Sequence, residues 1–200
     1  MAHLTIAILV AASGWTFDKD KVGDVPAGFE VAMTQGEPAG QWAVEKDGTG
    51  RVLAYTVKKP HEAFGVAVAK GRTYKDVAVS VRIKAVGGGY QAAGIVWRYK
   101  DPGNYYVARV KVADKNVHLF RVVDGKRTSI TAGKETPGVK PNEWQTLKVE
   151  HRGINIAVFV GGQKLVEAED KTFAEGRVGL WYKDDTTVHF DDLEVSEPRK

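Results

Sequence analysis

The strongest constraint on the fold is a strict alternation of side chains in residues 76–86, read DVAVSVRIKAV. Val77, Val79, Val81, Ile83 and Ala85 fall on one side of the pattern, and the intervening positions hold Ala, Ser, Arg and Lys. Successive side chains of a β-strand point to opposite faces of the sheet. The segment is therefore predicted to be a strand with one face in a core and the other open to solvent or to a ligand.

Short runs of the same kind recur along the whole chain, separated by turn-forming residues. Asp47 and Gly48 separate two alternating runs, as expected for a β-hairpin, and Gly161 and Gly162 separate another pair. Residues 92–123 read as a three-stranded antiparallel meander. About a dozen short strands need two sheets to bury their one-sided apolar faces, which predicts an all-β fold, a two-sheet antiparallel sandwich of jelly-roll type.

The N-terminus has the pattern of a signal peptide. Residues 4–12 form an apolar run too short to span a bilayer, and small residues lead to Ser13 and Gly14. The sequence predicts a signal peptide over residues 1–13 and one β-sandwich domain over residues 14–200, with a periplasmic or extracellular location. The alternative is that the run forms a first buried strand. No later stretch could span a membrane.

Composition excludes several classes of function. The chain has no Cys, which excludes thiol catalysis, thiolate metal sites and disulfides, although it does not exclude export. The net charge is +4, but basic residues are interspersed with acidic ones, so we expect a mixed solvated surface and no nucleic-acid partner. Nothing in the pattern indicates an oligomeric state.

Several phrases resemble one bacterial family. Residues 97–99 (WRY), 104–106 (NYY), 178–181 (VGLW) and 190–193 (FDDL) are the most specific. With the segments around them, they make residues 15–195 similar to the exported 3-keto-disaccharide hydrolase-like family of the concanavalin A-like lectin/glucanase superfamily. The resemblance implies a jelly roll with one concave sheet, sugar handling on that sheet, and export.

Five residues are candidates for a ligand site on the concave sheet: Arg82, Arg98, Tyr105, Arg109 and His118. Sugars pack apolar C–H faces on aromatic rings and bind donors such as Arg through their hydroxyls. Alternation places Trp97 and Arg98 on opposite faces, and we expect Arg98 to face outward with Arg82, Tyr105 and Arg109. Several arginines would favour acidic or highly hydroxylated glycans. A structural, hydrogen-bonded role for His118 is the alternative.

The function expected from these features is carbohydrate binding without cleavage. A glycoside hydrolase or lyase with an unrecognised acid/base pair is the alternative, and a structural domain without a ligand is a third. Glycoside hydrolysis needs two carboxylates beside the bond, and the Glu-x-Asp-x-x-Glu motif of laminarinase-type enzymes is missing. Glu167 with Glu169, or Asp191 with Asp192, could form such a pair. The catalytic residues stay unassigned.

No cofactor and no catalytic metal are expected. The histidines do not stand in a metal-ligand pattern, and no Ser lies in a Gly-x-Ser-x-Gly turn. Asp18, Asp20 and Asp24 could hold a structural calcium ion, because calcium prefers several oxygen ligands from a flexible loop. The alternative is that they are ordinary turn aspartates.

Overall fold

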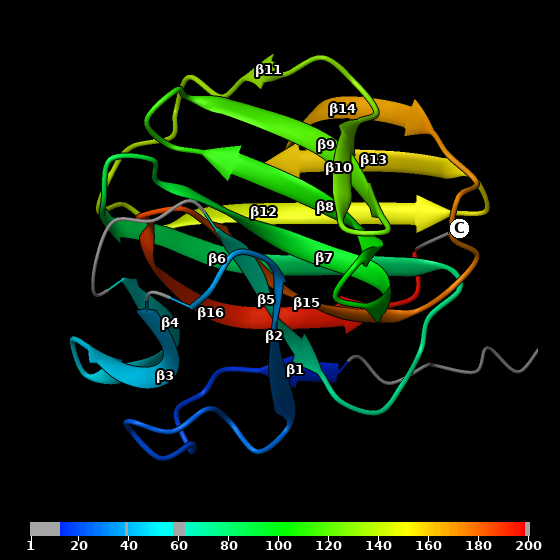
Figure 1. The fold of residues 1–200 in the computed structure, drawn as a ribbon. Coiled ribbons are helices and arrows are strands. Elements are labelled where there is room, and N and C mark those ends of the chain that lie inside the picture. Colours follow the sequence, from blue (N-terminus) through cyan, green and yellow to red (C-terminus); the bar gives the residue numbers. More distant parts are fainter. Residues whose placement is uncertain (1–12, 39, 58–62, 199–200) are drawn as a thin grey trace, which may run out of the picture.

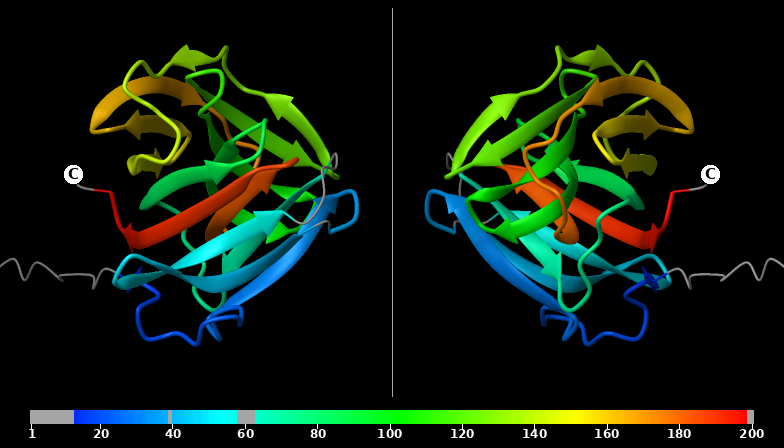
Figure 2. Two further views of the ribbon diagram at one scale, coloured as in Figure 1. Left: turned by 90° about the vertical axis from the view of Figure 1, so that its left-hand side faces the viewer. Right: turned by 90° about the vertical axis from the view of Figure 1, so that its right-hand side faces the viewer.

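The computed structural model describes residues 13–38, 40–57 and 63–198. In this part of the chain all regular elements are strands, and they form two antiparallel sheets of eight strands each (Figure 1). The sheets are stacked face to face (Figure 2). The predicted all-β sandwich is confirmed. The described residues contain no helix that is long and apolar enough to cross a membrane.

Sheet A contains the alternating segment predicted from the sequence. Its strands are β1 (Ser13–Trp15), β3 (Gly40–Asp47), β4 (Gly50–Val57), β6 (Val77–Gly87), β12 (Gln145–Arg152), β13 (Asn155–Val160), β14 (Gln163–Glu169) and β16 (Thr187–Ser196). They run in the order β14-β13-β12-β6-β16-β4-β3, and β1 pairs with β16. The predicted hairpin joins β3 to β4, and Gly48 in its turn has a φ of 62°, which Gly adopts without strain.

Sheet B contains the predicted meander. Its strands are β2 (Phe29–Gln35), β5 (Phe64–Ala69), β7 (Ala92–Asp101), β8 (Asn104–Lys111), β9 (Asn116–Val123), β10 (Lys126–Ser129), β11 (Lys134–Glu135) and β15 (Arg177–Lys183). They run in the order β10-β9-β8-β7-β15-β5-β2, and β11 pairs with β9. The antiparallel pairs β7–β8 and β8–β9 confirm the meander.

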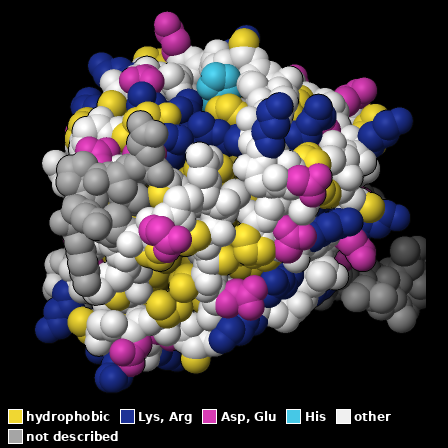
Figure 3. Space-filling view, in the orientation of Figure 1, with side chains coloured by type: hydrophobic (Ala, Val, Ile, Leu, Met, Phe, Trp, Pro, Cys, Tyr) yellow, Lys and Arg dark blue, Asp and Glu magenta, His cyan; other side chains and the backbone are white. Residues whose placement is uncertain are grey.

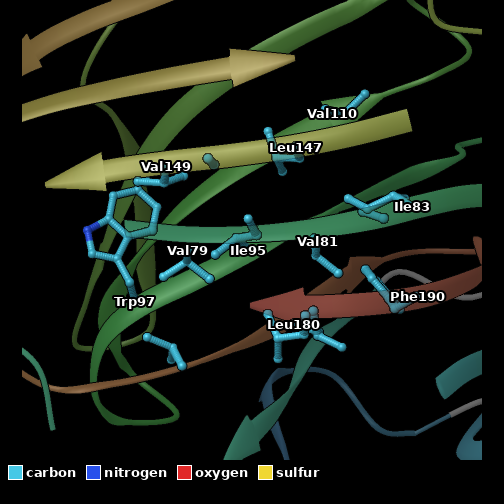
Figure 4. Packing of buried hydrophobic residues seen from close by; sticks show 14 of the residues in the cluster. Val79, Val81, Ile83, Ile95, Trp97, Val110, Leu147, Val149, Leu180 and Phe190 are labelled. Atoms are coloured by element: carbon cyan, nitrogen blue, oxygen red, sulfur yellow. The ribbon is translucent and has the colours of Figure 1, made fainter. Parts of the chain in front are cut away.

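The main core lies between the two sheets. The core face predicted for β6 is buried, and the residues of β6, β12 and β13 that face sheet B are each at most 3% exposed: Val79, Val81, Ile83, Leu147, Val149, Ile156 and Val158. Figure 4 shows residues of β6 and β12 facing Ile95 and Trp97 of β7. Each fully buried aliphatic side chain contributes about 1.5–3 kcal/mol to folding. This packing fixes which side chains of sheet B point away from the core.

One buried hydrogen bond connects the sheets across this core. The indole N–H of Trp97 on β7 donates to Nδ1 of His151 on β12 at 2.9 Å. Burial lowers the pKa of His151 to about 4, and the nearby Arg98 acts in the same direction. His151 is therefore neutral at pH 7 and can accept this bond.

The N-terminal prediction is only partly covered by the structure. Residues 1–12 lie outside the described residues, whereas Ser13 begins β1 and pairs with Val195 of β16. The predicted signal peptide therefore ends at the first residue of a short strand.

Candidate functional site

The outer face of sheet B carries a second group of buried hydrophobic residues, separate from the core between the sheets. Its members are Phe64, Val66, Val68, Ala92, Val96, Tyr99, Tyr105, Val107, Phe120, Val122 and Trp181. These side chains point to the outer face because their neighbours on the same strands point into the core between the sheets. The outer face of an antiparallel sheet is commonly polar. The aromatic rings here are at most 9% exposed, and this face is a candidate binding face because basic side chains lie against them.

The strand register places polar and aromatic residues in one row across this face. His118 of β9 pairs with Arg109 of β8, which pairs with Gly94 of β7, which pairs with Trp181 of β15. Because Gly94 has no side chain, nothing from β7 stands between Arg109 and Trp181 in this row. The backbone of β8 approaches Gly94 closely, since an added Cβ would clash with the carbonyl oxygen of Ala108.

Three basic side chains meet on the ring of Phe120. The guanidinium carbon of Arg127 lies 4.7 Å from the ring centre, and that of Arg109 lies 5.7 Å from it. The His118 ring centre is 4.8 Å away. We call Arg109, His118 and Arg127 the basic cluster. Figure 3, which views this side of the molecule, shows Lys and Arg side chains gathered beside a histidine on the upper half of the face.

Arg127 connects strands that are not neighbours. Its guanidinium carbon also lies 5.4 Å from the Phe64 ring centre and 5.5 Å from that of Trp181. Adjacent strands are about 4.8 Å apart, so in a flat sheet β9 and β15 would be separated by roughly 14 Å. The convergence of three rings on one guanidinium indicates that this face curves inward. In Figure 1, β10, which carries Arg127 and pairs with β9, runs more steeply than β8 and β9.

Several donors of this face are buried without a hydrogen-bond partner among the described residues. They are Nε of Arg109, Nη1 of Arg127 and Nε1 of Trp181, although Trp181 lies near enough to the Tyr105 hydroxyl to oppose the rise that burial causes in the pKa of Tyr105. Arg109 also donates through Nη2 to Oδ1 of Asn116. A buried donor without a partner costs about 1–3 kcal/mol.

Burial and charge determine the protonation of the site. Burial lowers the pKa of Arg109, and the neighbouring Arg127 adds to this effect. The pKa of His118 is also lowered, first by burial and then by Arg109 and Arg127. Burial raises the pKa of Tyr105, whose hydroxyl shares a 2.7 Å hydrogen bond with that of Thr34. At neutral pH the site thus combines two guanidinium ions with a neutral imidazole and a neutral phenol.

Three of the five predicted site residues lie together here. Tyr105, Arg109 and His118 all occupy the outer face of sheet B, as their spacing in the meander predicted. Phe120, Arg127 and Trp181 were missed. Alternation along β9 does place Phe120 on the same face as His118, and the Asp124–Gly125 turn brings Arg127 opposite Val122. The reach of Arg127 across the sheet depends on curvature, which the alternation pattern does not encode.

The prediction for Arg98 is wrong. Its side chain is 2% exposed and donates to the carbonyl oxygens of Lys75, Phe173 and Gly153, at 2.6–3.1 Å. The reason is an irregularity in β7, where Arg98 has a φ of 46° and the register with β8 shifts after Trp97. This shift turns Arg98 away from the binding face and places Tyr99 on it.

The expectation that Arg82 shares this face is also wrong. Arg82 lies on the outer face of sheet A, where Nη1 is 3.1 Å from Asp192 and 3.6 Å from Asp191, and where it stacks on Trp144. Both carboxylate pairs considered as acid and base belong to sheet A as well. Glu167 is held by Lys164 at 2.6 Å. These groups are on a different sheet from the basic cluster.

The three aspartates considered for calcium do not come together. Within the described residues there is no group of three or more His, Asp or Glu side chains that could hold a metal ion. Asp18 accepts a hydrogen bond from the backbone N–H of Arg51 at 3.0 Å, and Asp24 pairs with Lys21 at 2.9 Å. Both act as loop aspartates.

The fold belongs to the concanavalin A-like class of β-sandwiches. It is similar to the carbohydrate binding module CBM66 from Bacillus subtilis, with a TM-score of 0.66 and 24% identity over 84% of this chain and 96% of that one. It is also similar to the Bacillus licheniformis beta-glucanase, with a TM-score of 0.62 and 11% identity over 95% of this chain and 100% of that one. At these identities the similarity establishes the fold alone.

The sequence identifies the family. The profile of the 3-keto-alpha-glucoside-1,2-lyase-like domain matches residues 11–196, and the chain belongs to this family. A levanase from Bacillus subtilis (strain 168) is 31% identical over 103 residues, which are 51% of this chain. The match spans only 15% of the levanase.

Proposed function

We propose that the protein binds carbohydrate on the outer face of sheet B, around the basic cluster. The observation that carries this proposal is the presence of unpaired donors of Arg109 and Arg127 directly beside the rings of Phe120 and Trp181. A sugar presents C–H faces that pack on such rings and hydroxyl oxygens that accept from such donors. Membership of a family named for a glucoside supports the same ligand class.

The charges on this face favour binding without hydrolysis. Glycoside hydrolases place two carboxyl groups roughly 5–9.5 Å apart on either side of the scissile bond. In and beside sheet B, within the described residues, Glu30 is engaged by Arg177, Asp184 by Lys183 and Asp114 by Lys111, and no carboxylate lies within 4.0 Å of Arg109 or Arg127. The middle of the face is therefore cationic and aromatic, which suits recognition better than acid/base hydrolysis.

A lyase is the second candidate, favoured by one feature of the cluster and by the family. A keto group at C3 of a sugar acidifies the hydrogen on C2. A base can take that proton while the C1–O bond breaks, a C1=C2 double bond forms, and the leaving oxygen is protonated. Neutral His118 could accept the proton, and Arg109, whose Nη2 lies 3.4 Å from Nδ1 of His118, could stabilise the developing enolate oxygen.

A glycan array followed by titration calorimetry on the purified domain tests the first candidate. We expect a defined set of glycans to bind, and the absence of binding to every glycan would contradict it. Incubation with a 3-keto-alpha-glucoside tests the second candidate. A lyase releases the aglycone, and His118→Gln should then retain binding but abolish release. If the parent protein binds the 3-keto-alpha-glucoside without releasing the aglycone, the lyase candidate is contradicted and carbohydrate binding is the remaining function.

We also propose that the protein acts outside the cytoplasm, because residues 1–13 have the pattern of a signal peptide. The mature protein should then begin at Gly14, which leaves Gly14 and Trp15 to pair with β16. Mass spectrometry of the protein from its native host measures the terminus. A cytosolic protein that retains Met1 or Ala2 would contradict this proposal.

A further inference from the structure

Among the described Lys and Arg side chains of sheet B that are buried or half-buried, only Arg109 and Arg127 have no carboxylate within 4.0 Å, whereas Lys100, Lys126 and Lys134, which also form no ion pair, are exposed. Four other cations of the sheet each have a carboxylate within 4.0 Å: Lys111 with Asp114, Arg121 with Asp170, Arg177 with Glu30, and Lys183 with Asp184. Within the described part of the chain, neither Arg109 nor Arg127 forms an ion pair. The basic cluster therefore holds two positive charges without a paired carboxylate, although Tyr90 and the more distant Asp114 favour the charged form of Arg109.

This lack of compensation is not a general property of buried arginines in the chain. Arg98 is more deeply buried, but its guanidinium donates to three backbone carbonyls and lies 3.9 Å from Asp76. By contrast, Nε of Arg109 and Nη1 of Arg127 are buried without an acceptor among the residues that the structure describes. Burying a charge without a partner is costly unless function requires it.

The charges of the cluster also repel one another. Arg109 and Arg127 share the ring of Phe120, and each disfavours the protonated form of His118. Arg127 likewise disfavours the charge on Arg109. An anion placed between them would relieve this repulsion and supply acceptors for the two unused donors.

We infer that the carbohydrate bound by the basic cluster carries an anionic group, a carboxylate or a sulfate, which lies between Arg109 and Arg127. This inference rests on the proposed function and specifies the class of sugar. Neutral parts of the glycan would pack on the aromatic rings, whereas the anionic oxygens would accept from Nε of Arg109 and Nη1 of Arg127. The half-buried Tyr90 lies on the same side, with the ion-paired Lys111 at 4.1 Å and Lys183 at 4.4 Å from its ring centre.

Pairs of glycans that differ only in charge provide the test. Trigalacturonate and its methyl ester share one backbone, and a sulfated galactan oligosaccharide can be compared with its desulfated form. We expect at least one charged member to bind tenfold or more tightly than its neutral partner, with an affinity that falls as salt concentration rises. The two pairs distinguish a carboxylate from a sulfate.

Arg127→Gln removes one charge from the half-buried member of the cluster, and Arg82→Gln is the matched control on sheet A. Loss of one charged hydrogen bond should reduce binding of the charged glycan about tenfold, whereas binding of the neutral one should change little. The melting temperature of Arg127→Gln should change little, because the removal of repulsion offsets the loss of its contacts with three aromatic rings. A purely structural Arg127 would show the opposite pattern, with lower stability and unchanged preference.

Three other outcomes would contradict either the inference or the proposed function. Equal affinity for charged and neutral partners, or a preference for the neutral one, would overturn the inference and leave the proposed function standing. A preference for charge that persists unchanged in Arg127→Gln would overturn it as well, since the anion would then bind elsewhere. If no glycan of any kind binds, the proposed function itself fails.

Discussion

Arg98 and Arg109 show how the same residue type serves two purposes on adjacent strands. Arg98 donates hydrogen bonds to backbone carbonyl oxygens. By contrast, Nε of Arg109 has no acceptor among the described residues and lies on a face lined by aromatic rings. Both are almost fully buried, so burial alone does not distinguish them. The difference lies in their acceptors, which depend on the local shift of β7.

Arg98→Ala should therefore destabilise the fold. Its guanidinium holds Lys75, Phe173 and Gly153 together, and hydrogen bonds from a charged group contribute about 1.5–3 kcal/mol each. We expect a loss of roughly 3–5 kcal/mol in the free energy of unfolding, measured by denaturant titration. Arg177→Ala, which removes a partly exposed ion pair with Glu30, should cost less than about 1 kcal/mol. Equal costs for the two variants would contradict the structural role of Arg98.

At the scale of the element, regular strands could be predicted from sequence and irregular ones could not. The core face of β6 follows directly from period-two alternation, and the hairpins follow from their Asp-Gly and Gly-Gly turns. Alternation does not predict β7 correctly, because Arg98 adopts a positive φ. Such a conformation can be expected from the sequence at Gly, Asn or Asp, but not at Arg. The site was therefore predictable on β8 and β9 but not on β7.

The contacts that Arg127 on β10 makes across the sheet could not be predicted from the local sequence pattern either. Alternation and a turn place Arg127 on the outer face. They do not predict that its guanidinium crosses to Phe64 and Trp181, since that contact depends on how strongly the whole sheet curves. Contacts between distant strands arise from tertiary packing, which a local pattern does not contain.

Val81→Asp tests the register of β6. Val81 is fully buried between the sheets, and an unpaired carboxylate there should cost about 3–5 kcal/mol. The adjacent Ser80 points to the outer face of sheet A, so Ser80→Asn should change the free energy of unfolding by less than about 0.5 kcal/mol. Denaturant midpoints of the two variants provide the comparison. A parent-like midpoint for Val81→Asp would mean that the register is wrong.

For the whole molecule, the hydrogen bond between Trp97 and His151 makes the association of the sheets depend on pH. His151 has a pKa of about 4 in the folded state, compared with about 6.5 when unfolded. Between these values the unfolded chain binds more protons than the folded one. Stability should therefore fall as the pH falls through this window, by about 2 kcal/mol at pH 5 and about 3 kcal/mol below pH 4.

His151→Gln keeps an acceptor for Trp97 but cannot titrate. Its free energy of unfolding should depend less on pH between 4 and 6.5 than that of the parent protein, and denaturant titrations at pH 4.5, 5.5 and 7 would measure the difference. Asp170, whose pKa is lowered to about 2, affects stability only below its unfolded pKa near 4, so it does not obscure the comparison. Identical pH profiles would contradict the buried, neutral His151.

The central claim is that carbohydrate binds at the basic cluster on the outer face of sheet B. Calorimetric titration of Arg109→Ala beside Arg82→Ala, with a glycan that the parent protein binds, tests it most directly. Arg109 provides charged donors beside Phe120, and losing 1.5–3 kcal/mol corresponds to binding about 10- to 150-fold weaker. Arg82 lies on the other sheet, and its variant should bind like the parent. Unchanged binding by a folded Arg109→Ala, or equal losses in both variants, would contradict the account.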